Sequence, residues 1–498
     1  MISDEILSLL FTKTQFQKLV IFYELYSREI HYSEIEERLG DSKRGVRRAV
    51  ESLTLDIEEF NVEKNITLQI LSNKEKLFFS SPINDDEYIN LKYFLQEKYL
   101  QTSGLYNSLL YVLERRKFSL ISLTNFLSYS ESYVYKLMKK INKFFEMINL
   151  GIKISKGIES KYIIEGDEGT IRMLHYFLMN IALTENTWKF RTIDEKQINL
   201  INSAVKSERT DYLSPSNIKR VYIMIAIHEI AIKGGNRIQA LPDSLRDIGR
   251  IMNKEREIST YINNQHQRKL GNADYLQNEI VRLAFILNYF SQELRTKQEK
   301  ICIGKELFDN KKNSIVNPCI KLLEDLMKSY NFEKDLYYSL LYSLCNRLVV
   351  IHYLGVFKFL TLNDSPIKFK NIEKNVQNLI EKHLKEYKEE ASFPYICQSF
   401  KQLLLSYIKL SKDSALNIYI EIQNRPEYKV ILENELKLNY NNKILKIVED
   451  YSEADVVVAD THIQTNSKFF YFRDIYDQES WLSLTKFIDT NLKIIGTN

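Results

Sequence analysis

Basic side chains gather on two short segments in the first third of the chain, and each set is spaced to share one helix face. Segment 42–50 holds four basic residues and no acidic one: Lys43, Arg44, Arg47 and Arg48. The second set recurs at intervals of three and four: Lys136, Lys139, Lys140 and Lys143. Lysine and arginine neutralise phosphates and release their counterions, so such faces are typical of proteins that bind nucleic acid.

The elements around the first basic set follow a definite order. Residues 32–39 predict a short helix, Gly40 and Asp41 a turn, and Ser42 the N-cap of a helix that runs to about Glu59. Its inward stripe has helical spacing and consists of Val46, Val50, Leu53 and Ile57. Strands at 66–70 and 77–79 then form a hairpin whose turn carries Lys74. This order is that of a winged helix-turn-helix module.

The same order returns between residues 120 and 164. Residues 120–127 predict the supporting helix, 128–130 the turn and cap, and 131–149 the second helix. Strands at 152–154 and 162–164 form the hairpin, with Lys153 in the first of them. From Arg115 to Lys156 nine basic residues outnumber two acidic ones, whereas the net charge of the whole chain is only +4.

A single basic helix face is most often a solvated surface. Helix, turn, capped basic helix and hairpin in one order, twice, instead favour double-stranded DNA as the partner. We expect Arg44, Arg47 and Arg48 to contact bases or phosphates. The lysine-rich second helix should contribute mainly affinity for the DNA backbone. The ammonium group of lysine distinguishes bases less well than the forked guanidinium group of arginine does.

Composition limits the remaining possibilities. With 14 glycines and 7 prolines in 498 residues, we expect a largely helical protein of about three to five domains. The four cysteines form no Cys-x-x-Cys pair, which argues against zinc and against a disulfide scaffold and fits a reduced, cytoplasmic chain. The start lacks a signal segment, and no stretch reaches the roughly 18 apolar residues of a membrane span. We therefore expect a cytoplasmic protein without metal, cofactor or membrane contact.

Between residues 167 and 390 the chain is a run of amphipathic helices with a faint internal repeat. Segments 170–183 and 275–290 each open a unit as an aromatic-rich helix. Segments 216–232 and 334–351 follow as long apolar helices. Two helical bundles of about 100 residues each are the simplest interpretation.

The last part of the chain alternates strands with helices. Strands are predicted at 416–422, 444–448, 454–460 and 469–472, and helices at 426–440 and 478–489. This alternation implies a small α/β domain with a parallel sheet. Its first strand leads into 423–426, which holds neither a glycine-rich phosphate loop nor a cysteine or histidine nucleophile, so we do not expect an enzyme.

The order of these parts resembles the Mga/AtxA family of virulence and metabolism regulators from Gram-positive bacteria, over essentially the full chain. Segments 119–123, 133–136 and 163–166 of the second module look most like the family pattern. The resemblance implies a mainly α, multidomain transcription regulator that binds promoter DNA, AT-rich or bent, and forms a homodimer through its C-terminal domain. It implies winged helix-turn-helix modules at 1–82 and 83–166, helical domains of the sugar-phosphotransferase regulation type (PRD) at 167–272 and 273–392, and a domain similar to enzyme IIB at 393–498.

The resemblance also implies that regulation-domain histidines accept phosphate from the phosphocarrier protein of the sugar-uptake system. His228, in the middle of an apolar helix, is the first candidate, although a lone histidine there is usually a hydrogen-bonded core residue; His175 is the second. Aligning the repeats puts Cys345 and Asn346 opposite His228, with His352 two turns further on. The added negative charge would act at a helix-packing surface and bias a dimer.

Two other classes share some of these parts. An RNA-binding antiterminator also carries paired regulation domains, but it would begin with a short β-rich domain rather than basic helix-turn-helix modules. A component of the phosphotransferase system would need a nucleophile in the C-terminal domain, and the enzyme IIB cysteine is missing at the end of its first strand. That domain is therefore expected to serve dimerisation. The operator, and whether the regulator activates or represses, stay open.

Overall fold

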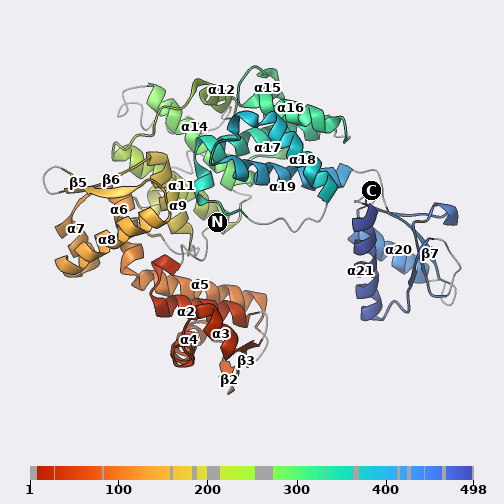
Figure 1. The fold of residues 1–498 in the computed structure, drawn as a ribbon, viewed down its shortest axis with the longest axis horizontal. Helices are drawn as coiled ribbons and strands as arrows, with labels where there is room; N and C mark the ends of the chain where they lie inside the picture. Colours follow the sequence, from red (N-terminus) through yellow and green to blue (C-terminus); the bar gives the residue numbers. More distant parts are fainter. Residues whose placement is uncertain are drawn as a thin grey trace. The chain divides into compact units, whose positions relative to one another are not determined.

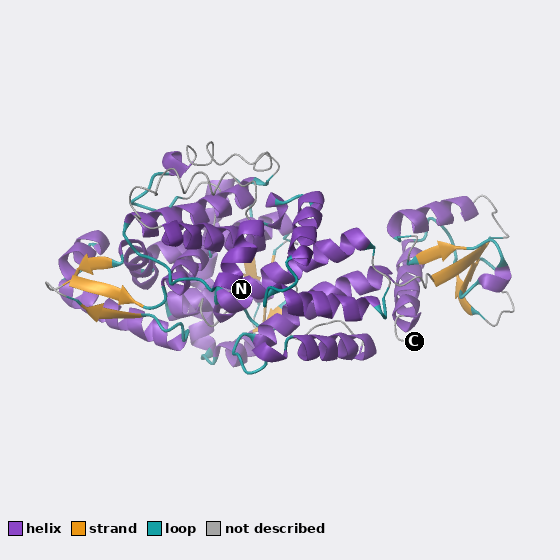
Figure 2. Cartoon of the chain, turned by 90° about the horizontal axis from the view of Figure 1, so that it is seen from above, coloured by secondary structure: helices purple, strands orange, loops and turns teal. Residues whose placement is uncertain are grey.

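The computed structural model describes residues 8–26, 29–73, 75–80, 83–157, 161–181, 188–198, 213–252, 273–330, 333–362, 370–411, 416–422, 428–441, 444–461 and 467–495. The chain divides into two compact units. Unit 1 comprises residues 1–296 and 349–361, and unit 2 comprises residues 297–348 and 362–498. Helices dominate the described residues and small sheets accompany them, which confirms the mainly helical class (Figure 2). The five predicted domain boundaries stay predictions.

The first module of unit 1 packs helices around a small antiparallel sheet (Figure 1). Its helices are α2 (Lys13–Leu25), α3 (Tyr32–Leu39), α4 (Lys43–Lys64) and α5 (Asp85–Thr102). Its strands are β1 (Ile30–His31), β2 (Ile70–Ser72) and β3 (Lys76–Phe79), in the order β1-β3-β2. The supporting helix, the turn and the start of the basic helix are as predicted.

Two features of this module differ from the prediction. The predicted strand at 66–70 was wrong over most of its length, because β2 starts only at Ile70. The Asn61 side chain instead bonds both backbone groups of Leu68, donating to its carbonyl oxygen at 2.7 Å and accepting from its N–H at 3.0 Å. The basic helix α4 also continues past Glu59 to Lys64. Lys74 lies outside the described residues.

The second module repeats the plan. It contains α6 (Gly104–Arg115), α7 (Leu120–Leu127) and α8 (Glu131–Met147), with strands β4 (Lys117–Ser119), β5 (Lys153–Lys156) and β6 (Lys161–Glu165) in the order β4-β6-β5. Both predicted helices and the predicted hairpin are confirmed. Helix α8 ends at Met147 rather than Asn149, whose φ of 49° leaves the right-handed helical region.

The rest of unit 1 is helical. It comprises α9 (Glu168–Asn180), α11 (Pro215–Lys233), α12 (Asp243–Met252), α14 (Ala273–Phe290) and the short η3 (Gln292–Leu294). A later stretch returns to this unit as the π-helix η4 (Val349–Tyr353) and the 3-10 helix η5 (Val356–Phe359). The ring of Phe359 stacks on that of Phe177 with centroids 4.8 Å apart, and the Leu354 carbonyl accepts a hydrogen bond from Arg282 at 3.3 Å.

The helical part of unit 2 comprises α15 (Lys297–Asp309), α16 (Val316–Met327), α17 (Lys334–Leu348), α18 (Lys370–His383), η6 (Lys385–Tyr387) and α19 (Phe393–Ser411). The predicted helix at 334–351 was wrong at its end, since α-helix gives way to π-helix after Leu348. Helices α15 and α17 are in close contact at Gly304, where an added Cβ would lie 2.0 Å from the Tyr338 carbonyl oxygen. No other side chain fits there without moving the backbone.

The C-terminal part of unit 2 is the predicted parallel sheet with flanking helices. Its elements are β7 (Leu416–Glu421), α20 (Tyr428–Asn439), β8 (Leu445–Ile447), η7 (Tyr451–Glu453), β9 (Val456–Ala459), β10 (Lys468–Tyr471) and α21 (Gln478–Ile495). All strand pairs are parallel, in the order β10-β9-β7-β8. Ile418, Val456 and Val458 form its core with Leu484 and Ile488 of α21. The predicted loop at 423–426 lies outside the described residues.

Candidate nucleic-acid interface

The turn of the first module fixes where helix α4 begins. Gly40 has a φ of 56°, a conformation that glycine adopts without a steric penalty, and ends α3. The Ser42 hydroxyl then accepts a hydrogen bond from the Gly45 N–H at 3.3 Å, as an N-cap residue does. Asp41 accepts hydrogen bonds from Lys13 of α2 at 2.8 Å and from Gln17 at 2.6 Å, and with the Ser42 N–H they lower the pKa of Asp41 to about 2.

The predicted basic side chains of α4 are exposed. They are Lys43, Arg44, Arg47 and Arg48. None of the four forms an ion pair with a carboxylate among the described residues. The Lys43 Nζ and the Arg47 guanidinium carbon lie 5.9 Å and 5.8 Å from the centroid of the Tyr32 ring, a cation–π arrangement that holds this end of α4 against α3. Four cations on one helix face are thus available to phosphates.

The opposite face of α4 is anchored in the module. Val46, Val50, Leu53 and Ile57 are all buried, which confirms the predicted inward stripe. Asp56 lies among them and accepts hydrogen bonds from Lys18 of α2 at 2.5 Å and from Lys98 and Tyr99 of α5 at 2.7 and 2.5 Å. Burial raises the pKa of Asp56, but these bonds outweigh it and lower the pKa below the usual value. The charged Asp56 therefore ties α2, α4 and α5 together.

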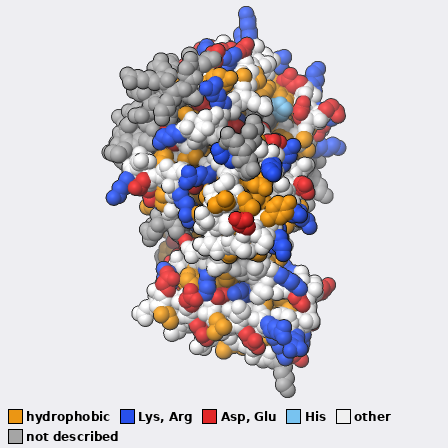
Figure 3. All heavy atoms as spheres, turned by 90° about the vertical axis from the view of Figure 1, so that its left-hand side faces the viewer, with side chains coloured by type: hydrophobic (Ala, Val, Ile, Leu, Met, Phe, Trp, Pro, Cys, Tyr) orange, Lys and Arg blue, Asp and Glu red, His pale blue; other side chains and the backbone are white. Residues whose placement is uncertain are grey.

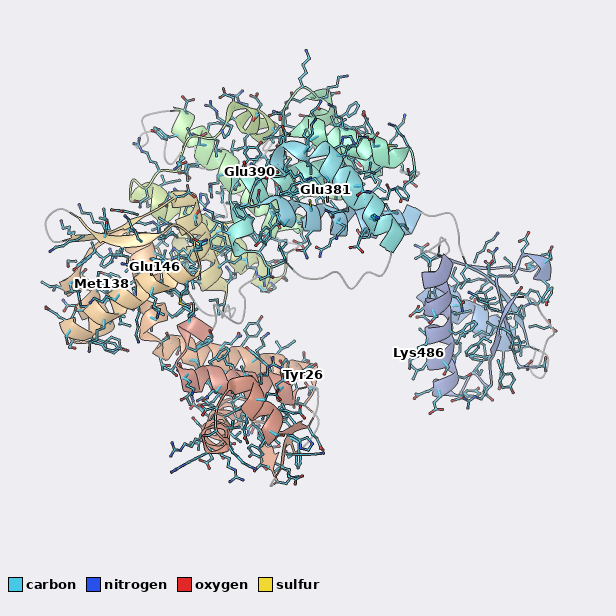
Figure 4. All side chains as sticks on the ribbon, viewed as in Figure 1. Tyr26, Met138, Glu146, Glu381, Glu390 and Lys486 are labelled. Carbon is cyan, nitrogen blue, oxygen red and sulfur yellow. The ribbon has the colours of Figure 1, made fainter. Side chains whose placement is uncertain are left out.

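The second recognition helix, α8, also presents lysines outward. Lys136, Lys139, Lys140 and Lys143 are exposed, and none pairs with a carboxylate in the described part of the chain. On the other side the stripe from Val134 to Phe145 is buried (Figure 4 labels the buried Met138 and the exposed Glu146 on this helix). The apolar face of α8 is therefore separate from its basic one.

The wing of the second module is tied directly to α8. The Asn142 side chain donates to the Ile154 carbonyl oxygen at 3.1 Å and accepts from its N–H at 2.7 Å, as Asn61 does for Leu68 in the first module. Lys153 is exposed on β5 and forms an ion pair with Glu165 at 3.1 Å. Because Glu165 neutralises Lys153, this wing lysine is less available to a phosphate than the lysines of α8.

The sequence analysis did not single out three exposed tyrosines of the second module. Tyr129, Tyr133 and Tyr135 are all exposed, and the Lys139 Nζ lies 4.9 Å from the centroid of the Tyr135 ring. Figure 3 looks onto one side of the molecule and shows hydrophobic side chains exposed among lysines and arginines. The signal in the sequence was the spacing of four between Tyr135 and Lys139, which places both on one helix face.

A buried charge network connects the second module to the helices that follow it. Arg116, which ends α6, forms an ion pair with Glu168 of α9 at 3.0 Å. Glu168 also accepts from Arg172 at 2.9 Å, and Arg172 donates to Glu279 of α14 at 2.5 Å and 3.0 Å. Glu279 therefore keeps a pKa well below its usual value despite burial. These residues come from separate helices, so only the Glu168–Arg172 spacing of four was visible in the sequence.

His228 belongs to this network. It is 3% exposed, and the Arg172 Nη1 lies 3.1 Å from its Nδ1. The same nitrogen lies 3.5 Å from the Glu279 Oε2, so His228 is enclosed between the cation and the carboxylate. Burial, helped by the Arg172 charge, lowers the pKa of His228 to about 4. These contacts are those of a hydrogen-bonded core histidine.

The other two predicted phosphoacceptors differ from each other in exposure. His175 of α9 is buried, its ring lies edge-on to Phe190, and burial lowers its pKa to about 3. His352, in the π-helix η4, is partly exposed. Of the three histidines, His352 is therefore the only one that is not buried.

No helix among the described residues is long and apolar enough to cross a membrane. No group of three or more potential metal ligands occurs in the same ranges.

Ser130 precedes α8 at the predicted cap position, but its side chain makes no capping hydrogen bond, so the cap predicted for this helix was wrong. Two helices with basic outward faces, each followed by a wing, define a winged helix-turn-helix protein. Residues 90–179 match the family model of the Mga helix-turn-helix domain, a segment that includes α6 to α8 and all three strands of the second module. This segment therefore holds an Mga-type helix-turn-helix domain, which agrees with the sequence resemblance to the Mga/AtxA family and supports a DNA-binding transcriptional regulator. No curated relative matches the chain.

Proposed function

We propose that this chain is a transcription regulator that binds double-stranded promoter DNA through α4 and α8, acts as a homodimer, and is controlled by phosphorylation of its helical domains. The observation that carries DNA binding is the pair of exposed basic faces, each on a helix whose other face is buried in its module. A helix of this kind enters the major groove, while its lysines and arginines neutralise phosphates.

The test of DNA binding is a mobility-shift titration at several salt concentrations. Replacing Arg44, Arg47 and Arg48 with alanine should weaken binding to all duplexes and flatten the dependence of affinity on salt. Arg250→Ala is the control, because this arginine is also exposed but lies on α12, outside both modules. Unchanged affinity in the triple variant would remove α4 from the interface. Tighter binding to a single-stranded RNA hairpin than to any DNA duplex would favour the antiterminator class instead.

The homodimer is proposed through the C-terminal domain. Helix α20 exposes Val430, Ile431 and Leu438 on one side, and Leu438 is 80% exposed. Apolar side chains at this spacing suit a contact with a second copy, whose equivalent helix would cover them. Light scattering should show a dimer for the full chain and a monomer after truncation behind Ser411. Val430→Asp with Leu438→Asp should have the same effect, and the neighbouring Lys437→Asp should not. A dimeric mass in the truncated chain would place the interface elsewhere.

Phosphate transfer from the phosphocarrier protein to a regulation-domain histidine is the proposed control. Arg172 lies 3.1 Å from the His228 ring and offers a cation for a phosphoryl group there. Since His228 is buried, its phosphorylation requires α11 to separate from its neighbours, whereas His352 is reached from the surface. An acid-labile phosphate should appear with phosphoenolpyruvate and the carrier proteins, and single replacements of His228, His175 and His352 by glutamine identify its position. Labelling that survives all three replacements would mean that another residue is modified.

A further inference from the structure

The outward face of α8 carries a tyrosine where its lysines would be expected to continue. Ser132, Lys136, Lys139 and Lys143 follow one another at helical spacing along the exposed side, and Tyr135 lies between Ser132 and Lys139 at intervals of three and four. Its side chain is 48% exposed. Tyr135 is therefore a large, partly apolar group in the first turns of a recognition helix, the part that contacts base edges.

The two tyrosines of α8 have different surroundings. The Tyr133 ring packs edge-on against Tyr129 of the preceding turn, with centroids 4.9 Å apart, and so belongs to the packing of the module. Tyr135 instead contacts Lys139, whose Nζ lies 4.9 Å from the ring centroid. This cation–π contact orients the ring along the exposed face next to a side chain that is expected at a phosphate. A phosphate bound by Lys139 would therefore have the Tyr135 ring beside it.

The chemistry of the major groove selects what such a ring can contact. The ammonium group of lysine only donates hydrogen bonds and gains no binding energy from an apolar group. The C5-methyl of thymine is the one apolar group on the major-groove edges of the four bases, and it is recognised by apolar contact with side chains such as phenylalanine. We propose that Tyr135 reads thymine methyl groups, so that the lysines of α8 supply affinity and this ring supplies preference for A·T-containing sites. This inference rests on the proposed binding of DNA by α8.

The test uses two 40-base-pair A·T duplexes of the same mixed sequence, one with thymine and one with uracil, which lacks only the methyl group. The wild-type chain should bind the thymine duplex at least about fourfold more tightly, which corresponds to about 0.8 kcal/mol for one buried methyl group. Tyr135→Ala should bind both duplexes equally, at the level at which the wild type binds uracil. Tyr135→Phe should keep the preference, because it keeps the ring.

Controls separate this role from its alternatives. Met147→Ala removes another exposed apolar side chain at the far end of α8 and should leave the preference unchanged. If Tyr135→Phe and Tyr135→Ala both bind the thymine and the uracil duplex more weakly than the wild type does, by the same factor, the hydroxyl contacts a phosphate and the proposal is wrong. Retention of the thymine preference by Tyr135→Ala would also overturn it. Failure of the wild type to bind either duplex would overturn DNA binding itself along with the methyl contact.

Discussion

Replacing Arg172 with methionine should destabilise unit 1 strongly, because this arginine stands at the centre of the buried charge network. Arg172 is 2% exposed and donates to Glu168, Glu279, the Asn236 carbonyl oxygen and the His228 ring. Methionine has a similar length and no charge, so the substitution removes the cation with little loss of volume.

The magnitude follows from what is left behind. Glu168 keeps Arg116 as a bonded partner, whereas Glu279 keeps no cation within ion-pair distance: the neutral His228 lies 3.5 Å away, and Arg282 acts on Glu279 only through space. Removing one partner of a buried ion pair typically costs about 3–5 kcal/mol, because the remaining charge is neither solvated nor paired. We expect a loss of about 4 kcal/mol at pH 7.5. Glu279→Gln in the same background should recover part of it, since it removes that unpaired charge, giving a coupling of about 1–3 kcal/mol.

The two tryptophans of the chain allow unit 1 to be followed alone. Trp188 belongs to unit 1, where it packs on Phe190, and Trp481 belongs to the C-terminal sheet domain. In a Trp481→Phe background, urea unfolding monitored by fluorescence therefore reports unit 1. Arg250→Met, which removes an exposed arginine, should change the free energy of unfolding by less than about 0.5 kcal/mol.

The same variant makes a prediction about pH. In the wild type the Arg172 charge helps to keep His228 unprotonated. Without that charge, folded His228 can take up a proton and pair with Glu279, so the stability difference between variant and wild type should shrink between pH 7.5 and pH 5.5. A loss below about 1 kcal/mol at pH 7.5, or additivity with Glu279→Gln, would refute the view that Arg172 neutralises Glu279.

Three further predictions concern the wild-type pH dependence and two local contacts. Because the pKa values of His228 and His175 are lowered to about 4 and about 3, the unfolded chain binds more protons below pH 6.5, and unit 1 should lose stability as pH falls toward 4. The loss should approach about 1.4 kcal/mol per pH unit for each histidine, so fluorescence-monitored unfolding of His175→Gln should show a smaller slope, and an unchanged slope would contradict the assignment. Gly304→Ala should destabilise the helical part of unit 2 by about 1–3 kcal/mol or more, whereas Lys305→Ala on the exposed side should not; equal melting by circular dichroism would show that the backbone yields. Ser42→Ala should cost about 1 kcal/mol in the first module and weaken DNA binding, whereas Ser42→Thr retains the cap; identical affinities for both would mean that α4 starts correctly without it.

The sequence predicted best those segments in which a regular spacing of apolar residues determines which side chains are buried. The inward stripes of α4 and α8 alternate with basic residues at helical spacing, and each stripe is buried as expected. The run at 456–459 is apolar at every position and forms a central strand of a parallel sheet, buried on both faces. Such patterns depend on one segment at a time.

The parts that the sequence did not predict depend on contacts between distant segments. Strands β1 and β4 are two and three residues long, too short for alternation to be recognised. Most of the predicted strand at 66–70 does not form, because Asn61, which belongs to another element, bonds Leu68 with its side chain. The charge network assembles side chains from α6, α9, α11 and α14, so no local spacing could show that His228 meets Arg172 and Glu279.

The return of residues 349–361 to unit 1 has a consequence for the order in which the protein can be completed during synthesis. Arg282 donates a hydrogen bond to the Leu354 carbonyl oxygen, and the ring of Phe177 stacks on that of Phe359. Both partners emerge from the ribosome only after α15, α16 and α17 of unit 2 have been made. A nascent chain can therefore already contain both winged modules and still lack part of the helical region of unit 1, to which Arg116 connects them. A chain terminated before residue 349 would contain both winged modules but an incomplete helical part of unit 1.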